Sequence, residues 1–106
     1  MSPITFFPIC KVRELKPGER LSLEIGGHPV VIINQDGEYF ALDDVCTHDD
    51  GLLGDGEVED HEIICPRHGA RFDLRTGEAT ALPAVSGIHI YPIRIVDDHL
   101  EIGIES

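Results

Sequence analysis

The sequence predicts an all-β fold, an antiparallel sandwich or barrel, and three observations lead to this class. Short or alternating apolar runs recur along the whole chain, as partly buried strands require. Turn signals separate these runs at spacings typical of antiparallel hairpins rather than of crossover helices. No sustained helical stripe, internal repeat or low-complexity linker interrupts the pattern. We therefore expect one domain over residues 1–106, without an internal boundary.

Eight runs are expected to form the strands. In chain order they are ITFFPI (4–9), RLSLEI (20–25), HPVVII (28–33), EYFALDDV (38–45), HEIIC (61–65), ARFDL (70–74), GIHIYPIRIV (87–96) and HLEIGI (99–104). The turn signals between them are Pro17-Gly18, Gly26-Gly27, Asp36-Gly37, Thr76-Gly77 and Asp97-Asp98. Pairs of this kind favour tight turns because their residues tolerate the backbone conformations that such turns need.

Composition and charge limit the cellular location and the kinds of partner that we expect. The chain has 106 residues, of which 42% are hydrophobic, enough for one core. It lacks both a run of about 18 apolar residues, which a spanning helix needs, and the features of a signal peptide, so a cytoplasmic protein is expected. The formal net charge of −12 argues against nucleic acid and membrane as partners, and it favours a partner with a basic docking face.

Cysteine usage points away from a disulfide framework. The chain has three cysteines, and this odd number is better explained by metal binding or by reduced thiols. Cys10 lies in an apolar segment with no partner motif nearby, so we expect it to be a buried structural thiol.

Two segments depart from the strand pattern and carry the candidate ligands. Residues 46–56 read CTHDDGLLGDG and residues 65–69 read CPRHG, which are loop compositions. Loops on a β scaffold commonly hold functional groups. Each loop supplies one cysteine and one histidine, in the pattern C-x-H-x16-C-x-x-H: Cys46, His48, Cys65 and His68. This spacing alone allows either a tetrahedral zinc site or a pair of irons.

The surroundings of the four residues favour iron and sulfide. Zinc fingers and ribbons usually open with two cysteines in a tight knuckle, and the metal replaces a core, whereas here a full β domain surrounds two mixed loops. A nucleophilic Cys–His dyad would use one pair and leave the other unexplained. An iron–sulfur cluster uses both pairs.

The pattern and its setting resemble the Rieske family of [2Fe–2S] proteins, in particular the small stand-alone Rieske-type ferredoxins, and the resemblance covers nearly the whole chain. It implies one Rieske-type [2Fe–2S] cluster held by a subdomain of two loops. Cys46 and Cys65 would bind one iron, while His48 and His68 would bind the other with their imidazole edges facing solvent.

The resemblance also implies roles for neighbouring residues. Leu52 and Leu53 would form an apolar rim near the ligands. The segment Leu82-Pro-Ala84 resembles the proline-containing loop that covers the cluster in the family.

The remaining histidines and the chain length argue against substrate chemistry. We expect His28, His61, His89 and His99 to be surface residues rather than ligands. No two-histidine, one-carboxylate iron site is recognisable, and no second domain is available to hold one. The chain is therefore not expected to be an enzyme.

Four positions bear on the reduction potential. High-potential members of the family carry a disulfide between the cluster loops and two hydroxyl donors to sulfur. The matching positions in this chain are Gly51, Arg67, Ala70 and Phe72. Donors to sulfur stabilise the reduced state, so their absence predicts a low potential.

Charges near the loops act in opposite directions. Asp49 and Asp50 disfavour an added electron, whereas Arg67 and Arg71 favour it. Because these effects on the reduction potential oppose each other, the prediction of a low potential rests on the missing hydroxyl groups. Asp49 and Asp50 are expected at the docking face.

The resemblance implies a soluble one-electron carrier that takes electrons from a flavin-dependent reductase and delivers them to a terminal oxygenase or a similar redox enzyme. Two alternatives remain: an electron-transfer subunit similar to the small subunit of nitrite reductase, and a zinc-stabilised interaction domain. Visible colour separates the zinc domain from the others, since zinc gives no visible absorption.

Overall fold

A computed structural model describes residues 3–45, 53–66, 69–81 and 87–105 of the chain. All strand pairs in these residues are antiparallel, which confirms the predicted all-β class. The strands are β1 (Ile4–Lys11), β2 (Arg20–Ile25), β3 (His28–Gln35), β4 (Glu38–Asp43), β5 (Glu57–Glu59), β6 (Glu62–Ile64), β7 (Arg71–Asp73), β8 (Ala79–Ala81), β9 (Ile93–Val96) and β10 (His99–Glu105). Two short 3-10 helices, η1 (Val12–Glu14) and η2 (Leu53–Asp55), complete the elements.

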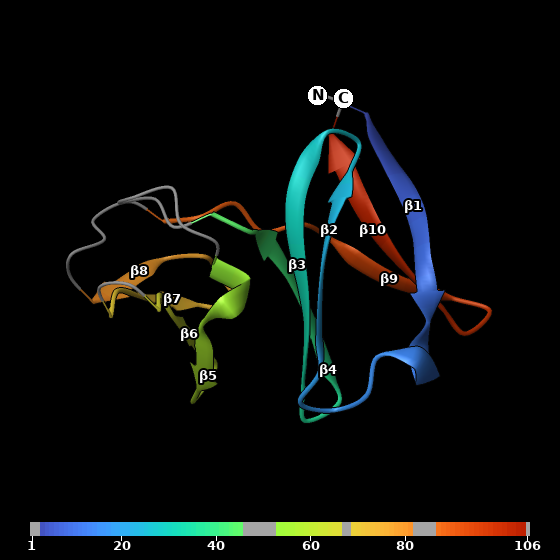
Figure 1. Cartoon of the computed structure of the whole chain (residues 1–106). Coiled ribbons are helices and arrows are strands. Elements are labelled where there is room, and N and C mark those ends of the chain that lie inside the picture. The colour runs from blue at the N-terminus through green and yellow to red at the C-terminus, as the bar shows by residue number, and fades with distance from the viewer. Residues whose placement is uncertain (1–2, 46–52, 67–68, 82–86, 106) are drawn as a thin grey trace.

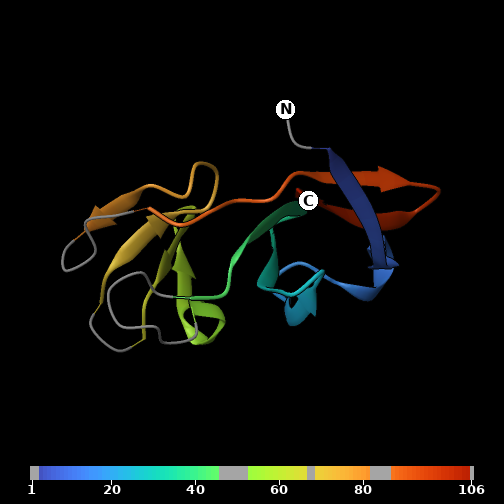
Figure 2. The ribbon, with the colours of Figure 1, turned by 90° about the horizontal axis from the view of Figure 1, so that it is seen from above.

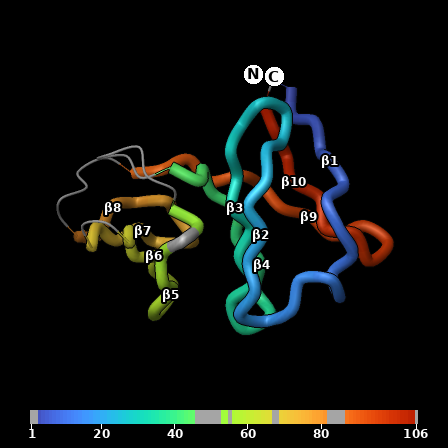
Figure 3. Tube along the Cα trace, viewed as in Figure 1, coloured from blue at the N-terminus to red at the C-terminus, as the bar shows by residue number. Residues whose placement is uncertain are grey.

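The strands form three sheets. Their orders are β1-β10-β9, β2-β3-β4 and β5-β6-β7-β8. We call the first two sheets the base and the third, together with η2, the small lobe; Figure 1 shows the small lobe on the left of the base. In the tube of Figure 3, the β2-β3-β4 sheet stands between the small lobe and the β1-β10-β9 sheet. The view from above gives the same order (Figure 2).

The middle sheet is covered on both faces, which explains the unbroken apolar run of β3. Val30 and Ile32 pack in the core shared with the β1-β10-β9 sheet. Val31 and Ile33 point the other way and pack with the small lobe. Because successive side chains of a strand face opposite sides, a strand between two layers needs apolar residues at every position.

The small lobe is inserted in the chain between β4 and β9. The two connecting segments run side by side, through a bridge between Leu42 and Ile90. The Asp43 amide donates to the His89 carbonyl oxygen at 2.9 Å, and the Tyr91 amide donates to the Ala41 carbonyl oxygen at 2.9 Å. None of the helices in the described ranges is long and apolar enough to cross a membrane.

The strand predictions were correct for most runs. Within the described residues, the sequence missed β5 and β8, whose sequences EVE and ATA lie in no apolar run; β6 and β7 are equally short but lie in the predicted runs 61–65 and 70–74. The run over residues 87–96 forms a strand only in its second part, β9, because the first part is the connecting segment to the base.

Tight turns follow the predicted positions. Asp36 and Gly37 have φ of 51° and 92°, and Asp97 and Asp98 have φ of 49° and 65°. This left-handed region is open to glycine and comparatively tolerated by aspartate. A further turn of this kind, between β5 and β6, was not predicted.

Candidate metal centre

Cys65 begins a tight turn between β6 and β7. Its side chain is buried, and its amide donates to the Ala70 carbonyl oxygen at 2.7 Å. The Gly69 amide donates back to the Cys65 carbonyl oxygen at 3.0 Å, and Gly69 has φ of +74°, which favours glycine. The turn therefore holds the thiol at a fixed place at the end of a strand.

The other three candidate ligands, Cys46, His48 and His68, lie outside the described residues, as do Asp49, Asp50, Gly51, Leu52, Arg67 and the segment 82–84. The structure thus locates the ends of the two ligand loops. The first loop follows Asp44 and Val45 and ends at η2, and the second opens at Cys65.

The interior beside Cys65 is apolar. Ala70, Phe72 and Leu53 are each fully buried and belong to the same core as Cys65. The prediction that Leu53 forms an apolar rim was wrong: at 0% exposure its side chain packs inward, because η2 turns it toward the β2-β3-β4 sheet and the small lobe. The positions of Ala70 and Phe72 contribute no hydroxyl group to this interior.

The two ends of the first ligand loop are joined by a buried carboxylate. Asp44 is 4% exposed, and its Oδ1 accepts a hydrogen bond of 2.5 Å from the Gly54 amide. The Asp44 amide donates to the Pro29 carbonyl oxygen at 2.9 Å, which ties the same residue to β3. Sequence reasoning had placed Asp44 at the end of a strand and gave it no role.

Arg20 of β2 binds the backbone at the C-terminal end of this loop. Its guanidinium donates to the Gly54 carbonyl oxygen at 2.7 Å and also to the Gly56 carbonyl oxygen. A β-carbon at Gly56 would overlap the carbonyl oxygen of Ile64, the residue before Cys65. The start of the second ligand turn is therefore packed directly against the chain that leaves the first loop.

An ion-pair network joins β5, β6 and β7. Arg71 pairs with Glu62 at 3.2 Å and with Glu59 at 3.5 Å. The pKa of Glu62 lies below its usual value, chiefly because Thr80 donates a hydrogen bond to it and also because Arg71 is near. The positive charge of Arg71 is thus offset by its own neighbours, which weakens its expected influence on a nearby cluster.

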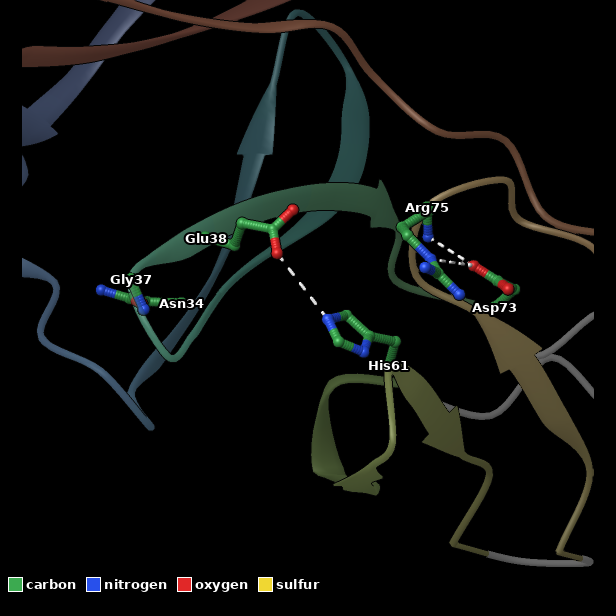
Figure 4. Close-up of polar contacts among 6 residues, drawn as sticks. All are labelled: Asn34, Gly37, Glu38, His61, Asp73 and Arg75. Atoms are coloured by element: carbon green, nitrogen blue, oxygen red, sulfur yellow. Dashed lines mark hydrogen bonds and ion pairs between the residues drawn. The ribbon is translucent and has the colours of Figure 1, made fainter.

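The remaining histidines lie at least partly exposed at the surface, as predicted. His61 in the turn between β5 and β6 reaches the base, with Nε2 at 3.7 Å from Glu38 Oε1 (Figure 4), and its ring meets the Phe40 ring edge-on. The rings of His28 and His89 contact Tyr91 edge-on. Among the described residues, no three histidine, cysteine, aspartate or glutamate side chains form a group that could hold a metal.

Two further residues have shifted pKa values, Asp73 in the small lobe and Cys10 in the base. Asp73 accepts a hydrogen bond of 2.7 Å from the Arg75 amide in the turn after β7 (Figure 4), and this bond is the main cause of the lowered pKa of Asp73. Cys10 packs against the base core, but it is only partly buried and not the buried thiol that was predicted. Desolvation, followed by the charge of Glu14, raises the pKa of the Cys10 thiol.

The donor chemistry fits an iron–sulfur cluster. A buried thiol at the end of a short strand, in a turn closed by two backbone hydrogen bonds, is a rigid sulfur ligand of the type that such clusters require. The apolar core behind it excludes water from one side.

Comparison with known proteins agrees with the iron–sulfur interpretation of the site. Residues 5–92 match the Rieske [2Fe-2S] domain. The ferredoxin component of biphenyl 2,3-dioxygenase from Rhodococcus jostii (strain RHA1) is 38% identical over 97 residues, which cover 92% of this chain and 91% of that protein. The ferredoxin subunit of 3-phenylpropionate/cinnamic acid dioxygenase from Photorhabdus laumondii is 36% identical over 97 residues, 91% of each chain.

Solved structures agree in fold. The ferredoxin of Sphingomonas yanoikuyae B1 is 35% identical and superposes with a TM-score of 0.85, covering 94% of this chain and 99% of that one. A putative nitrite reductase small subunit from Mycobacterium tuberculosis superposes with a TM-score of 0.88 over 98% of each chain, but at 20% identity this likeness concerns the fold alone.

Proposed function

Because this chain belongs to the Rieske [2Fe–2S] family and carries a Rieske-type cluster, we propose that it is the ferredoxin component of a dioxygenase system. In this role it is an electron carrier and not a catalyst, like the relatives that are named ferredoxin components. The zinc-stabilised interaction domain is set aside, since the family match covers most of the chain.

The observation that carries the proposal is the match along almost the full length of a dioxygenase ferredoxin, with 38% identity. The chain covers 91% of that relative, so the comparison concerns the whole carrier and not a shared fragment. The proposal treats residues 1–106 as one functional unit.

In this proposal, Cys46 and Cys65 bind one iron, and His48 and His68 bind the other. The pattern of the four residues and the buried position of Cys65 support the assignment. The bound cluster supplies one-electron chemistry, and the chain holds it and shields its inner side.

The partners follow from the same reasoning. A flavin-dependent reductase would supply the electron, and the terminal oxygenase of the system would receive it. Both would present basic surfaces to a carrier with a net charge of −12. We infer a cytoplasmic location, in which an odd number of cysteines can remain reduced.

Metal and sulfide analysis tests the cofactor. The purified protein should contain two irons and two acid-labile sulfides per chain, as a [2Fe–2S] cluster requires. It should be coloured, and its reduced form should give an electron paramagnetic resonance signal. A single zinc ion without sulfide would contradict the assignment.

The reduction potential provides a second test. We expect a midpoint potential of about −150 mV, the low end of the Rieske range, because Ala70 and Phe72 supply no hydroxyl to the cluster. Ala70→Ser and Phe72→Tyr should each raise the potential by roughly 60 mV, the effect of one hydrogen bond to a charged acceptor.

The matched control is Ala41→Ser, which adds the same hydroxyl to a buried alanine of β4 in the separate core of the base and should leave the potential unchanged. A potential well above 0 mV for the parent protein, measured by voltammetry, would contradict the low-potential assignment.

A further inference from the structure

We infer that Asp44 is a positioning residue for the cluster, and that its carboxylate, with help from Arg20, fixes the chain before Cys46 to the chain at Gly54–Gly56. The inference rests on the proposed function, since it takes Cys46 and Cys65 as ligands. It concerns side chains that do not themselves bind iron.

The position of Asp44 in the chain is the first argument. Asp44 precedes Cys46 by two residues, and its carboxylate reaches forward to the Gly54 amide, ten residues along the chain. The hydrogen bond of 2.5 Å thus joins the two ends of the segment that contains Cys46 and His48. With Asp44 at 4% exposure, the bond is shielded from water, which strengthens a charge-assisted hydrogen bond.

The fit around Gly54 is the second argument. A β-carbon there would lie 2.6 Å from Ser22 Oγ, 2.9 Å from Asp44 Oδ1 and 3.3 Å from Val31 Cγ2. A side chain at this position would displace Ser22 and the Asp44 carboxylate, so the backbone of Gly54 packs directly against β2, β3 and the carboxylate. Such close packing means that the amide has one position in which to meet Asp44.

Arg20 and Gly56 extend the connection to the second ligand turn. Arg20 binds the carbonyl oxygens of Gly54 and Gly56, so the residue whose amide Asp44 holds is bound through its carbonyl group as well. Gly56 packs on the carbonyl of Ile64, and Glu57 pairs with Ile64 in the sheet. A chain of direct contacts therefore runs from Asp44 to the residue before Cys65.

This arrangement fixes the separation between Asp44, two residues before Cys46, and Ile64, the residue before Cys65. A [2Fe–2S] cluster needs both thiolates on one iron, so any loosening of one segment relative to the other favours release of the cluster. Groups that orient ligands without touching the metal typically change metal affinity by about tenfold to a hundredfold when removed.

The test measures the rate of cluster loss from the purified holoprotein. Visible absorbance is followed in the presence of the iron chelator bathophenanthroline disulfonate. Asp44→Ala should lose its cluster roughly tenfold faster than the parent. Asp44→Asn keeps an oxygen that can accept from the Gly54 amide, and should stay within about threefold of the parent, the effect of exchanging a charged for a neutral acceptor.

Asn34→Ala is the matched control for general destabilisation. Asn34 is 2% exposed, donates to the Leu15 carbonyl oxygen at 2.7 Å and accepts from the Gly37 amide at 2.9 Å. It also loses buried hydrogen bonds on replacement, but it lies beside Gly37 at the turn between β3 and β4 (Figure 4), at the opposite end of β4 from Asp44. This variant should release its cluster at nearly the parent rate.

The inference is overturned if Asp44→Ala releases its cluster no faster than Asn34→Ala, or if Asp44→Asn behaves like Asp44→Ala. If Asp44→Ala does not fold, Arg20→Met replaces it, because this change removes both hydrogen bonds that Arg20 donates to the same turn, and the same comparison decides. A parent protein without iron and sulfide would instead contradict the proposed function. The two failures are thus distinguishable.

Discussion

Replacing His48 or His68 by alanine should remove the [2Fe–2S] cluster almost completely. One iron would lose half of its protein ligands, so the iron and sulfide content should fall from two of each per chain to near zero. Cys65→Ala should have the same effect, because the other iron would lose one of its two thiolates. Iron and sulfide analysis, together with the visible spectrum of protein purified without reconstitution, measures this loss.

The chain supplies its own controls for this experiment. His28 in β3 and His89 in the segment that connects the small lobe to the base are both exposed and contact Tyr91 edge-on. His89→Ala and His28→Ala remove an imidazole of the same kind, and both should retain the full cluster. A His48 or His68 variant with parental iron and sulfide would contradict the ligand assignment, as would loss of the cluster from His89→Ala alone.

Electron transfer to the oxygenase should slow as salt is added. The twelve excess acidic charges of this small domain steer it toward a basic partner, and the screening length falls from about 10 Å at 0.1 M salt to about 3 Å at 1 M. Stopped-flow measurement of the second-order rate should show a fall of at least about tenfold over this range. Asp49→Asn/Asp50→Asn should lower the rate at low salt and flatten the dependence.

The control for position is Asp97→Asn/Asp98→Asn, which removes two charges from the turn between β9 and β10. Figure 1 places this turn at the end of the molecule opposite the small lobe. The control should retain nearly the parent rate if steering depends on where the charges lie.

A rate that is indifferent to both salt and the Asp49/Asp50 substitution would reject acidic steering. In that case docking would rest on apolar contact, which salt does not screen. Leu53 is excluded from such a contact surface by its complete burial.

The sheets of the base were predictable because their strands are long and regularly patterned. β2 coincides with its predicted run, and β3 extends the predicted run by two residues. The tight turns were predictable for a local reason, since glycine and aspartate tolerate left-handed backbone. β5 (EVE) and β8 (ATA) could not be predicted, because they lack an apolar run and are specified by their neighbours in the sheet, whereas the equally short β6 and β7 lie in apolar runs.

The candidate ligands were recognisable from residue type and spacing alone, since few side chains bind iron. The residues that hold the ligand loops in place were not. Asp44 differs in no obvious way from the other acidic residues of the sequence, and its importance depends on a contact with Gly54 that folding creates. The pair Gly54 and Gly56 was the available signal, because both positions exclude a side chain. Leu53 was misjudged because sequence does not reveal which way a leucine after a loop points.

The paired entry and exit of the small lobe have a consequence for how such proteins can change. The bridge between Leu42 and Ile90 lies where the chain leaves the base and where it returns to it. The two ends of the small lobe are therefore adjacent in the fold. An exchange of residues between these points for those of a relative would preserve the connectivity of the base. It would succeed only when the incoming lobe fits the face formed by Val31, Ile33 and Phe40, since these side chains belong to the core that both parts share. The small lobe can thus be exchanged between related proteins, provided that the incoming lobe packs against this apolar face of the base.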